Sequence, residues 1–185
     1  MTPQINGRDA VKYQIIYADP PWDYKGQTQH GGKKTSDTGG ALSHYPTMTL
    51  KQLVELKPMV DTLADNNCLL FMWSSSPHLD QAIDLLKAWG FAYATIGFIW
   101  DKQRVNPGFY TMSQCEIVLI GKRGRIPKNR GARNIRQFYS ELRGRHSAKP
   151  HEIRRRIELM FPEQNKIELF ARERFDGWDS WGNEV

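Results

Sequence analysis

A short apolar run that leads directly into two prolines constrains this chain more than any other feature. Residues 13–18 (YQIIYA) are apolar and rich in β-forming side chains, and Asp19, Pro20 and Pro21 follow at once. Proline fixes its own φ and lacks an N–H donor, so two in succession end a strand and force a turn. The residue before each proline is pushed to extended geometry. We therefore expect a buried strand that ends in a rigid turn.

Strand-like and helix-like patterns alternate along the rest of the chain. Further strands are predicted over 68–73, 93–100, 116–120 and 166–170. Helices are predicted over 49–56, from Ser76-Pro77 to Gly90, and from Pro150 to Pro162. This alternation indicates an α/β fold with a largely parallel sheet that helices cover on both faces. A chain of 185 residues suits one domain, 1–185, and ligands of such sheets bind at the carboxyl ends of the strands.

The tetrapeptide Asp19-Pro20-Pro21-Trp22 lies at such a strand end. Because the prolines carry no N–H, the turn offers acceptors alone: the Asp19 carboxylate and the Pro20 carbonyl. Trp22 is expected to place a flat apolar surface beside them. Two acceptors suit an exocyclic amine on a planar ring, since they favour a pyramidal nitrogen whose lone pair points outward. The alternative is a proline-rich strand end with a capping Asp. No metal is predicted, because the five His are scattered and no Cys/His cluster has ligand spacing.

Positive charge is concentrated in one part of the chain. The net charge is +6, from 26 Lys and Arg against 20 Asp and Glu, and residues 122–156 hold 13 of the cations with two acids. A solvated charged face is one interpretation, but such an imbalance repels itself unless an anion neutralises it. We expect a nucleic acid as partner, and charge alone does not separate DNA from RNA. The segment 122–148 is predicted to bind it, through Lys122, Arg123, Arg125, Lys128, Arg130 and Arg133.

Residues 23–46 are polar, hold five glycines and are predicted to be a flexible active-site loop that closes over a target base. Tyr24, Tyr45 and Trp73 are candidates to stack on a base drawn out of a duplex, with core packing the alternative for Tyr45 and Trp73. No apolar run approaches the roughly twenty residues of a membrane helix, so no membrane partner is expected. The two Cys lie in apolar runs and predict free thiols and a cytoplasmic protein.

Two cations stand at predicted ligand edges. Lys149 precedes the Pro150 helix, whose first N–H groups and dipole attract anions. A cation there is unfavourable unless an anion lies between, although an exposed surface lysine is the alternative. Arg172 follows the strand KIELFA, where an ordinary strand-ending charge is equally compatible.

Taken together, these motifs resemble the adenine-N6 methyltransferase family of the seventy-kilodalton catalytic subunit that methylates eukaryotic mRNA. Small phage and bacterial members of that family mostly methylate DNA. The resemblance covers residues 13–185, and the segments that carry it, in order, are YADPPWDY, YPTM, LLFMWSS, FIWDK, CEIVLIGKRG, SAKPHE, KIELFAR and WGNE.

The resemblance implies a Rossmann-like methyltransferase fold with S-adenosylmethionine as donor. Asp19, Pro20, Pro21 and Trp22 would then form the catalytic turn, with Asp19 also beside the cofactor. Lys149 would meet the cofactor carboxylate, and Arg172, Asn183 and Glu184 would contact its ribose and adenine. Two positions depart from the family pattern. Arg174-Phe175 replaces a His-Asn pair, so Arg174 is only a candidate cofactor contact, and Glu184 replaces a Gln.

The function expected from residues and resemblance together is methylation of the N6 amine of adenine, with DNA favoured over RNA. The same reaction on RNA adenosine and a catalytically silent nucleic-acid-binding subunit are the alternatives. Methylation of protein glutamine is a third, but the enzymes that perform it carry Asn-Pro-Pro-Tyr. A homodimer is compatible with the sequence.

Overall fold

The computed structural model describes residues 11–23, 47–107, 110–144 and 148–185. Tyr24, Tyr45 and nearly all of the predicted active-site loop 23–46 lie outside the described residues.

A single mixed sheet forms the centre of the molecule. Its seven strands are arranged in the order β5-β3-β4-β2-β1-β6-β7. Their bounds are β1 Tyr13–Ala18, β2 Ala64–Ser75, β3 Ala92–Asn106, β4 Ser113–Arg123, β5 Phe138–Ser140, β6 Lys166–Leu169 and β7 Asp179–Trp181. Each strand predicted from sequence lies within or overlaps one of these, so the periodicity located them correctly.

The sheet is mostly parallel, with one antiparallel insertion. β1 pairs in parallel with both β2 and β6, β6 with β7, and β3 with β5. β4 is antiparallel to both of its neighbours, β2 and β3. The connections from β1 lead to β2 on one side, and β6 lies on the other side. The sheet therefore has its topological switch point beside β1, where open α/β sheets bind ligands.

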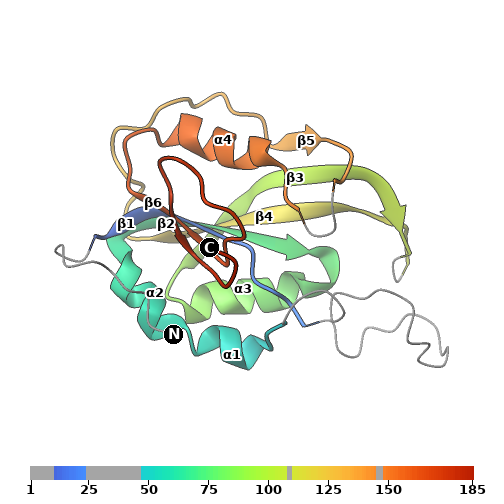
Figure 1. The fold of residues 1–185 in the computed structure, drawn as a ribbon, viewed down its shortest axis with the longest axis horizontal. Coiled ribbons are helices and arrows are strands. Elements are labelled where there is room, and N and C mark those ends of the chain that lie inside the picture. Colours follow the sequence, from blue (N-terminus) through green and yellow to red (C-terminus); the bar gives the residue numbers. More distant parts are fainter. Residues whose placement is uncertain (1–10, 24–46, 108–109, 145–147) are drawn as a thin grey trace.

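Helices cover both faces of the sheet, as Figure 1 shows. α1 (Leu50–Val54), α2 (Lys57–Leu63) and α3 (Leu79–Ala88) lie on one face, and α4 (His151–Met160) lies on the other. This three-layer arrangement confirms the predicted α/β fold of the Rossmann-like methyltransferase type.

Local sequence signals explain most helix boundaries. Thr49 and Gln52 form a reciprocal capping box at the start of α1. Pro58 lies in the first turn of α2, so it restarts the helix rather than ending it. Gly90, with φ of +83°, ends α3. One boundary differs from expectation: Ser76–His78 form a 3-10 turn, η2, with Ser75 as its cap, and α3 begins at Leu79.

The alternation of side chains along β1 divides the core into two clusters. Ile16 packs with α1, α2 and α3, whereas Ile15 and Tyr17 point to the opposite face and pack with α4. Both faces of this strand are therefore buried, as its uninterrupted apolar sequence predicts.

The described residues can also be searched for a metal site, a membrane-spanning helix and disulfides. Within them, no group of three His, Cys, Asp or Glu is placed to hold a metal ion. No described helix is long and apolar enough to cross a membrane. Cys68 and Cys115 are free thiols, the first buried and the second half-buried.

Candidate active site

The turn after β1 is tied down by its own backbone. The Trp22 N–H donates to the Pro20 carbonyl at 2.9 Å, and the Met48 N–H donates to the Pro21 carbonyl at 2.8 Å. A carbonyl has two lone pairs, so the Pro20 oxygen keeps a second acceptor position. Asp19, at the head of the turn, has a carboxylate side chain that is 21% exposed. The rigid acceptor turn expected from the two prolines is therefore present.

Trp22 does not lie where the sequence analysis placed it. Its side chain is 6% exposed, stacks on His78 with ring centres 5.7 Å apart, and donates from Nε1 to the Trp73 carbonyl at 3.3 Å. The expectation that Trp22 gives the ligand a flat surface is wrong, because the indole is held in the core by packing. Its role here is to tie the end of β1 to the end of β2.

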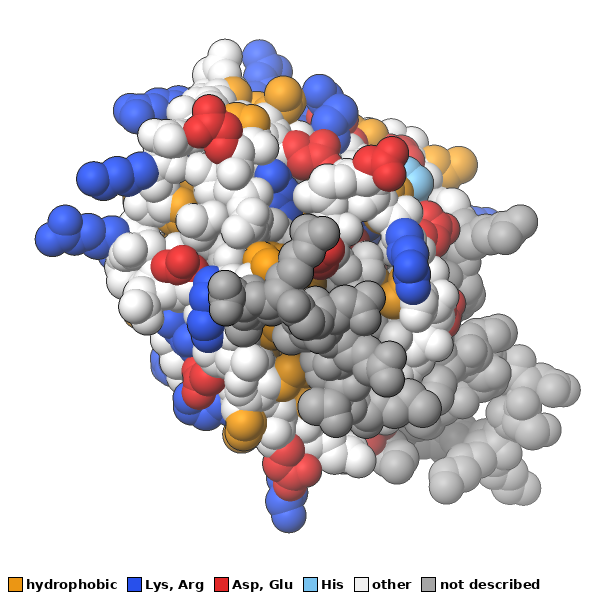
Figure 2. All heavy atoms as spheres, turned by 60° about the vertical axis from the view of Figure 1, so that its left-hand side comes forward, with side chains coloured by type: hydrophobic (Ala, Val, Ile, Leu, Met, Phe, Trp, Pro, Cys, Tyr) orange, Lys and Arg blue, Asp and Glu red, His pale blue; other side chains and the backbone are white. Residues whose placement is uncertain are grey.

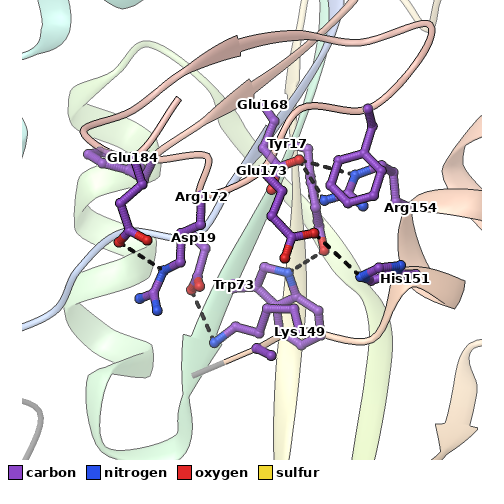
Figure 3. A pocket seen from close by; sticks show the side chains of 13 residues that line it. Tyr17, Asp19, Trp73, Lys149, His151, Arg154, Glu168, Arg172, Glu173 and Glu184 are labelled. Carbon is purple, nitrogen blue, oxygen red and sulfur yellow. Dashed lines mark hydrogen bonds and ion pairs between the residues drawn. The ribbon is translucent and has the colours of Figure 1, made fainter. Parts of the chain in front are cut away.

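A cavity of about 220 Å³ opens at the carboxyl ends of β1 and β6, beside the start of α4. Figure 3 shows that side chains from these three elements point toward one another. Asp19, Lys149, Arg172 and Glu184, which the sequence predicted as site residues, all line it. A second cavity of about 360 Å³, lined by Trp100 and Glu141, shares Ala148, Lys149 and His151 with the first. The structure thus gathers residues from both ends of the chain at the predicted edge.

Four alternating charges form a chain that begins at the first cavity, which Asp19 and Lys149 line, and continues beyond it to Glu116 and Lys102. Lys149 Nζ lies 3.2 Å from Asp19 Oδ1 and 2.9 Å from Glu116 Oε2. Lys102 Nζ lies 3.3 Å from Glu116 Oε1. We call Asp19, Lys149, Glu116 and Lys102 the charge chain; its two carboxylates and two ammonium groups balance one another. All four side chains are about one-fifth exposed or less.

Burial and neighbouring charges shift the pKa values of this chain in different directions. Burial raises the pKa of Asp19 above its ordinary value, although Lys149 opposes the shift. Burial also acts to raise the pKa of Glu116, but Lys149 and Lys102 together outweigh it and hold that pKa below its usual range. Burial disfavours the charged form of Lys149, yet Asp19 and Glu116 raise its pKa overall. Lys149 is therefore a permanent cation beside Asp19.

One wall of the cavity is built on Tyr17 and Trp73. The Trp73 Nε1–H donates to the Tyr17 hydroxyl at 2.6 Å, and the Trp73 side chain is 1% exposed. Lys149 Nζ lies over the indole, 5.2 Å from the ring centre. Of the two alternatives for Trp73, core packing is correct, because its ring face is already covered. The prediction that it stacks on a target base is wrong.

The far wall is an ion pair between α4 and β6. Arg154 donates from Nε and Nη2 to Glu168 Oε2 at 3.1 and 2.7 Å. Its guanidinium also lies 3.4 Å from the centre of the Phe175 ring. Arg154 and Glu168 were not predicted as site residues.

The C-terminal segment reaches the cavity through a close backbone approach. The Ala171 N–H donates to the Trp181 carbonyl at 3.0 Å, and a Cβ on Gly182 would lie 2.1 Å from the Ala171 oxygen. Only glycine fits there, and it brings Glu184 Oε1 to 4.0 Å from Arg172 Nε. Asn183 and Arg174 are exposed and do not line the cavity, so their cofactor contacts stay predictions.

The basic side chains that the structure describes in the segment 122–144 do not line this cavity. β4 runs away from it: Glu116 pairs with Ser75 near the carboxyl end of β2, whereas Arg123 pairs with Cys68 near its start. None of the six predicted substrate contacts lines the cavity, and these are Lys122, Arg123, Arg125, Lys128, Arg130 and Arg133. Arg123 is instead bonded to Asp61 at 2.9 Å. Antiparallel pairing of β4 carries them to the edge of the sheet opposite the cavity, so their contact with nucleic acid stays a prediction.

The charges of the cavity fit S-adenosylmethionine. Four carboxylates and three Lys or Arg side chains line it, which leaves one net negative charge when His151 is neutral. At neutral pH the cofactor carries a carboxylate, an ammonium and a sulfonium, hence one net positive charge. The two net charges are complementary, and Lys149 and Arg172 are cationic hydrogen-bond donors in the cavity wall.

Sequence reasoning missed Glu116, Tyr17, Arg154 and Glu168. A charged residue that interrupts an apolar strand, as Glu116 and Glu168 do, is a signal for a paired carboxylate. Its partner lies far along the chain, however, and no periodicity reveals it.

Comparison with known proteins agrees with this geometry. The sequence profile of the MT-A70 family matches residues 13–184. The chain is 47% identical over 184 residues to Type II methyltransferase M.MunI from a Mycoplasma species, covering 94% of this chain and 78% of that protein. It is 29% identical to the Drosophila melanogaster N(6)-adenosine-methyltransferase MT-A70-like protein and 26% identical to the human N(6)-adenosine-methyltransferase catalytic subunit METTL3. Here the alignments cover 94% of this chain but 27% and 28% of those proteins. With the fold, the acceptor turn and the complementary cavity in place, the chain belongs to the MT-A70 family of S-adenosylmethionine-dependent methyltransferases.

Proposed function

We propose that this chain methylates the exocyclic N6 amine of adenine in DNA. The observation that carries the proposal is the position of Asp19. Its carboxylate is partly exposed in the cavity, at the end of a turn whose two prolines present carbonyl acceptors and no donors.

Asp19 has an acceptor left for such an amine. Lys149 contacts Oδ1 of Asp19, so Oδ2 is available to one amine hydrogen, and the second lone pair of the Pro20 carbonyl is available to the other. An amine held by two acceptors keeps its lone pair directed away from them, toward the methyl donor. Asp19 also lies where it can take up the proton that the methylated nitrogen releases. The turn contributes mainly alignment, which its rigidity provides before the substrate arrives.

The cofactor supplies the methyl group from its sulfonium, and the residues proposed to hold it lie on three elements. We propose that Lys149 and the first N–H groups of α4 bind its carboxylate, since a helix start attracts anions. Arg172 and Glu184, after β6 and β7, are proposed to bind its ribose and adenine, since a carboxylate accepts from hydroxyl groups. Asn183 and Arg174 are proposed as outer contacts on the same segment.

The choice of DNA rests on the relatives. A protein named a type II methyltransferase is 47% identical, whereas those named for N(6)-adenosine methylation are 26–29% identical over a quarter of their length. Adenine in RNA is the second candidate, supported by those names. Tyr24 and Tyr45 stay candidates to stack on the extruded base, within a segment that leaves at Asp23 and returns at Thr47, beside the Trp22–Met48 bridge.

The test is nucleoside mass spectrometry of DNA and RNA from cells that express the chain. We expect N6-methyladenine in DNA, and its loss in Asp19→Asn, which keeps the shape of the side chain but replaces one acceptor oxygen with a donor. Asp84→Asn, an exposed position on α3, is the matched control. Binding of S-adenosylmethionine, measured by calorimetry, should persist in Asp19→Asn. Near-normal methylation by Asp19→Asn would refute the role of the carboxylate, and a product confined to RNA would refute the choice of DNA.

A further inference from the structure

Residues 122–133 carry six cations and no acid, and the structure places them on the side of the sheet away from the cavity. Glu116, in the charge chain, and Arg123 lie at opposite ends of β4. They are seven residue steps apart along the strand, which is about 23 Å at 3.3 Å per step. Whatever these cations bind is therefore distant from the reacting amine.

This segment is irregular but firmly attached. The Gly131 and Ala132 N–H groups donate to the Met160 and Leu159 carbonyls at 2.9 and 2.7 Å. The Arg125 N–H donates to Asn67 Oδ1 at 2.8 Å. A Cβ on Gly131 would lie 2.3 Å from the Leu159 oxygen, so the chain is seated closely against the end of α4. The backbone is therefore fixed before any ligand arrives, which lowers the ordering penalty of binding.

Four of the cations form no ion pair with any residue that the structure describes. Lys122, Arg125, Lys128 and Arg133 are exposed, and we call them the rear basic surface. Among the described residues no carboxylate forms an ion pair with any of them. The nearby acid Glu163 instead accepts from Asn129 at 3.0 Å. Figure 2 looks at the side of the molecule that is on the left in Figure 1, and Lys and Arg side chains project from its margin.

Stabilisation of the α4 dipole does not account for these charges. The terminal carbonyls of α4 already accept from the backbone N–H groups of Gly131 and Ala132. The other two cations of the segment have partners, since Arg123 is paired with Asp61 and Arg130 lies over Phe161 at 5.5 Å. The rear basic surface is the part left without one.

We propose that the rear basic surface is a second DNA-backbone site, which holds a duplex segment other than the one whose base enters the cavity. The cavity opens at one edge of the sheet and the rear basic surface lies at the opposite edge, so a duplex seated at the cavity must bend around the protein to reach that surface, which carries an elastic cost. Exposed Lys and Arg contact phosphates without reading sequence. One chain can therefore bridge two duplex segments. The inference rests on the proposed function for the segment at the cavity.

The experiment measures bridging. The protein is added to an immobilised 20-base-pair duplex, and capture of a second, fluorescent 20-base-pair duplex is recorded. We expect capture by the parent chain and at least a tenfold loss in Arg125→Gln/Lys128→Gln/Arg133→Gln, with methylation of the same duplex within about twofold of the parent. Lys51→Gln, which removes an exposed charge on α1 away from the rear basic surface, is the control and should leave capture unchanged.

Three results would overturn the proposal: no capture by the parent, equal capture by the triple variant, or methylation that falls as far as capture does. A protein dimer could also capture a second duplex, through the cavity of its second subunit, and the triple variant would retain that capture. Sedimentation of each variant shows whether such a dimer is present. Asp19→Asn should capture like the parent. Failure of the proposed function would appear separately, as absent N6-methyladenine with capture intact.

Discussion

The charge chain makes a quantitative prediction about stability. Asp19, Lys149, Glu116 and Lys102 are electrically balanced only as a set. Glu116→Gln leaves a net positive charge in a partly dry site, and Lys102→Met leaves a net negative one. Replacing both restores the balance, because Asp19 and Lys149 then form a simple pair. The double variant should therefore be less destabilised than the sum of the two single variants.

The magnitude follows from the burial of the two side chains. Lys102 is 8% and Glu116 19% exposed, and their charged atoms are 3.3 Å apart. Removing one partner of a fully buried pair costs about 3–5 kcal/mol. Partial exposure lowers this to roughly 2–3 kcal/mol for each single variant. A coupling energy of about 1–2 kcal/mol is then expected between the two positions, within the range for residues in contact.

Urea unfolding of the parent, the two single variants and the double variant measures this coupling at pH 7. The control cycle is Lys57→Met and Asp61→Asn, an exposed pair on α2 whose coupling should be only about 0.3–0.5 kcal/mol. Additive effects at Lys102 and Glu116, within about 0.5 kcal/mol, would refute the charge-chain argument.

The same side chain makes stability depend on acid. The pKa of Glu116 is lower in the folded chain than in the unfolded one. The contribution of Glu116 to the free energy of unfolding is therefore complete above its unfolded-state pKa of about 4.3, and it is lost as pH falls through its folded-state pKa. Glu116→Gln should show a smaller loss of stability below that pH than the parent.

Three further predictions concern the site. Burial raises the pKa of Asp19, and only the ionised carboxylate accepts the amine, so kcat/KM should fall as pH falls through an Asp19 pKa that lies above the ordinary 3.8. Lys149 lowers that pKa, so Lys149→Met should move the acid side of the pH profile to higher pH. Gly182→Ala should weaken S-adenosylmethionine binding at least tenfold by calorimetry, since its Cβ meets the Ala171 oxygen, whereas Gly144→Ala, with nothing within 4 Å, should not. Trp22→Phe should lower the free energy of unfolding by about 1–3 kcal/mol, because the hydrogen bond to the Trp73 carbonyl is lost. The KM for DNA should stay within about threefold. A large rise in that KM with unchanged stability would show that Trp22 contacts the substrate.

Local sequence patterns were sufficient to place the strands and the acceptor turn. A strand that is buried on both faces has a continuous apolar sequence, and two consecutive prolines allow only one local geometry. The structure of residues 13–21 could therefore be predicted from the sequence alone. Lys149 and Arg172 were also predictable, because each follows from a helix start or a strand end in a parallel sheet.

The inferences that failed were ones that needed the direction of a side chain or of a strand. Trp73 lies near the carboxyl end of β2, yet its indole points into the core and donates a hydrogen bond to the Tyr17 hydroxyl. The six cations after residue 121 look contiguous with Lys149 in sequence. Antiparallel pairing of β4 with β2 carries them to the other edge, and nothing in the apolar run of β4 distinguishes that orientation from a parallel one.

The tetrapeptide itself divides into a chemical part and a structural part. Asp19 faces the cavity, whereas Trp22 anchors the turn to the end of β2 through the Trp73 carbonyl. That anchor matters because Lys149 competes for the carboxylate: a turn free to move would let Asp19 close onto the lysine and bury both acceptor oxygens. Glu116 works against the same outcome from the other side, since it shares the Lys149 charge at 2.9 Å. Asp19 is thus held between a fixed backbone and a lysine already partly neutralised, which leaves one of its oxygens for an incoming amine.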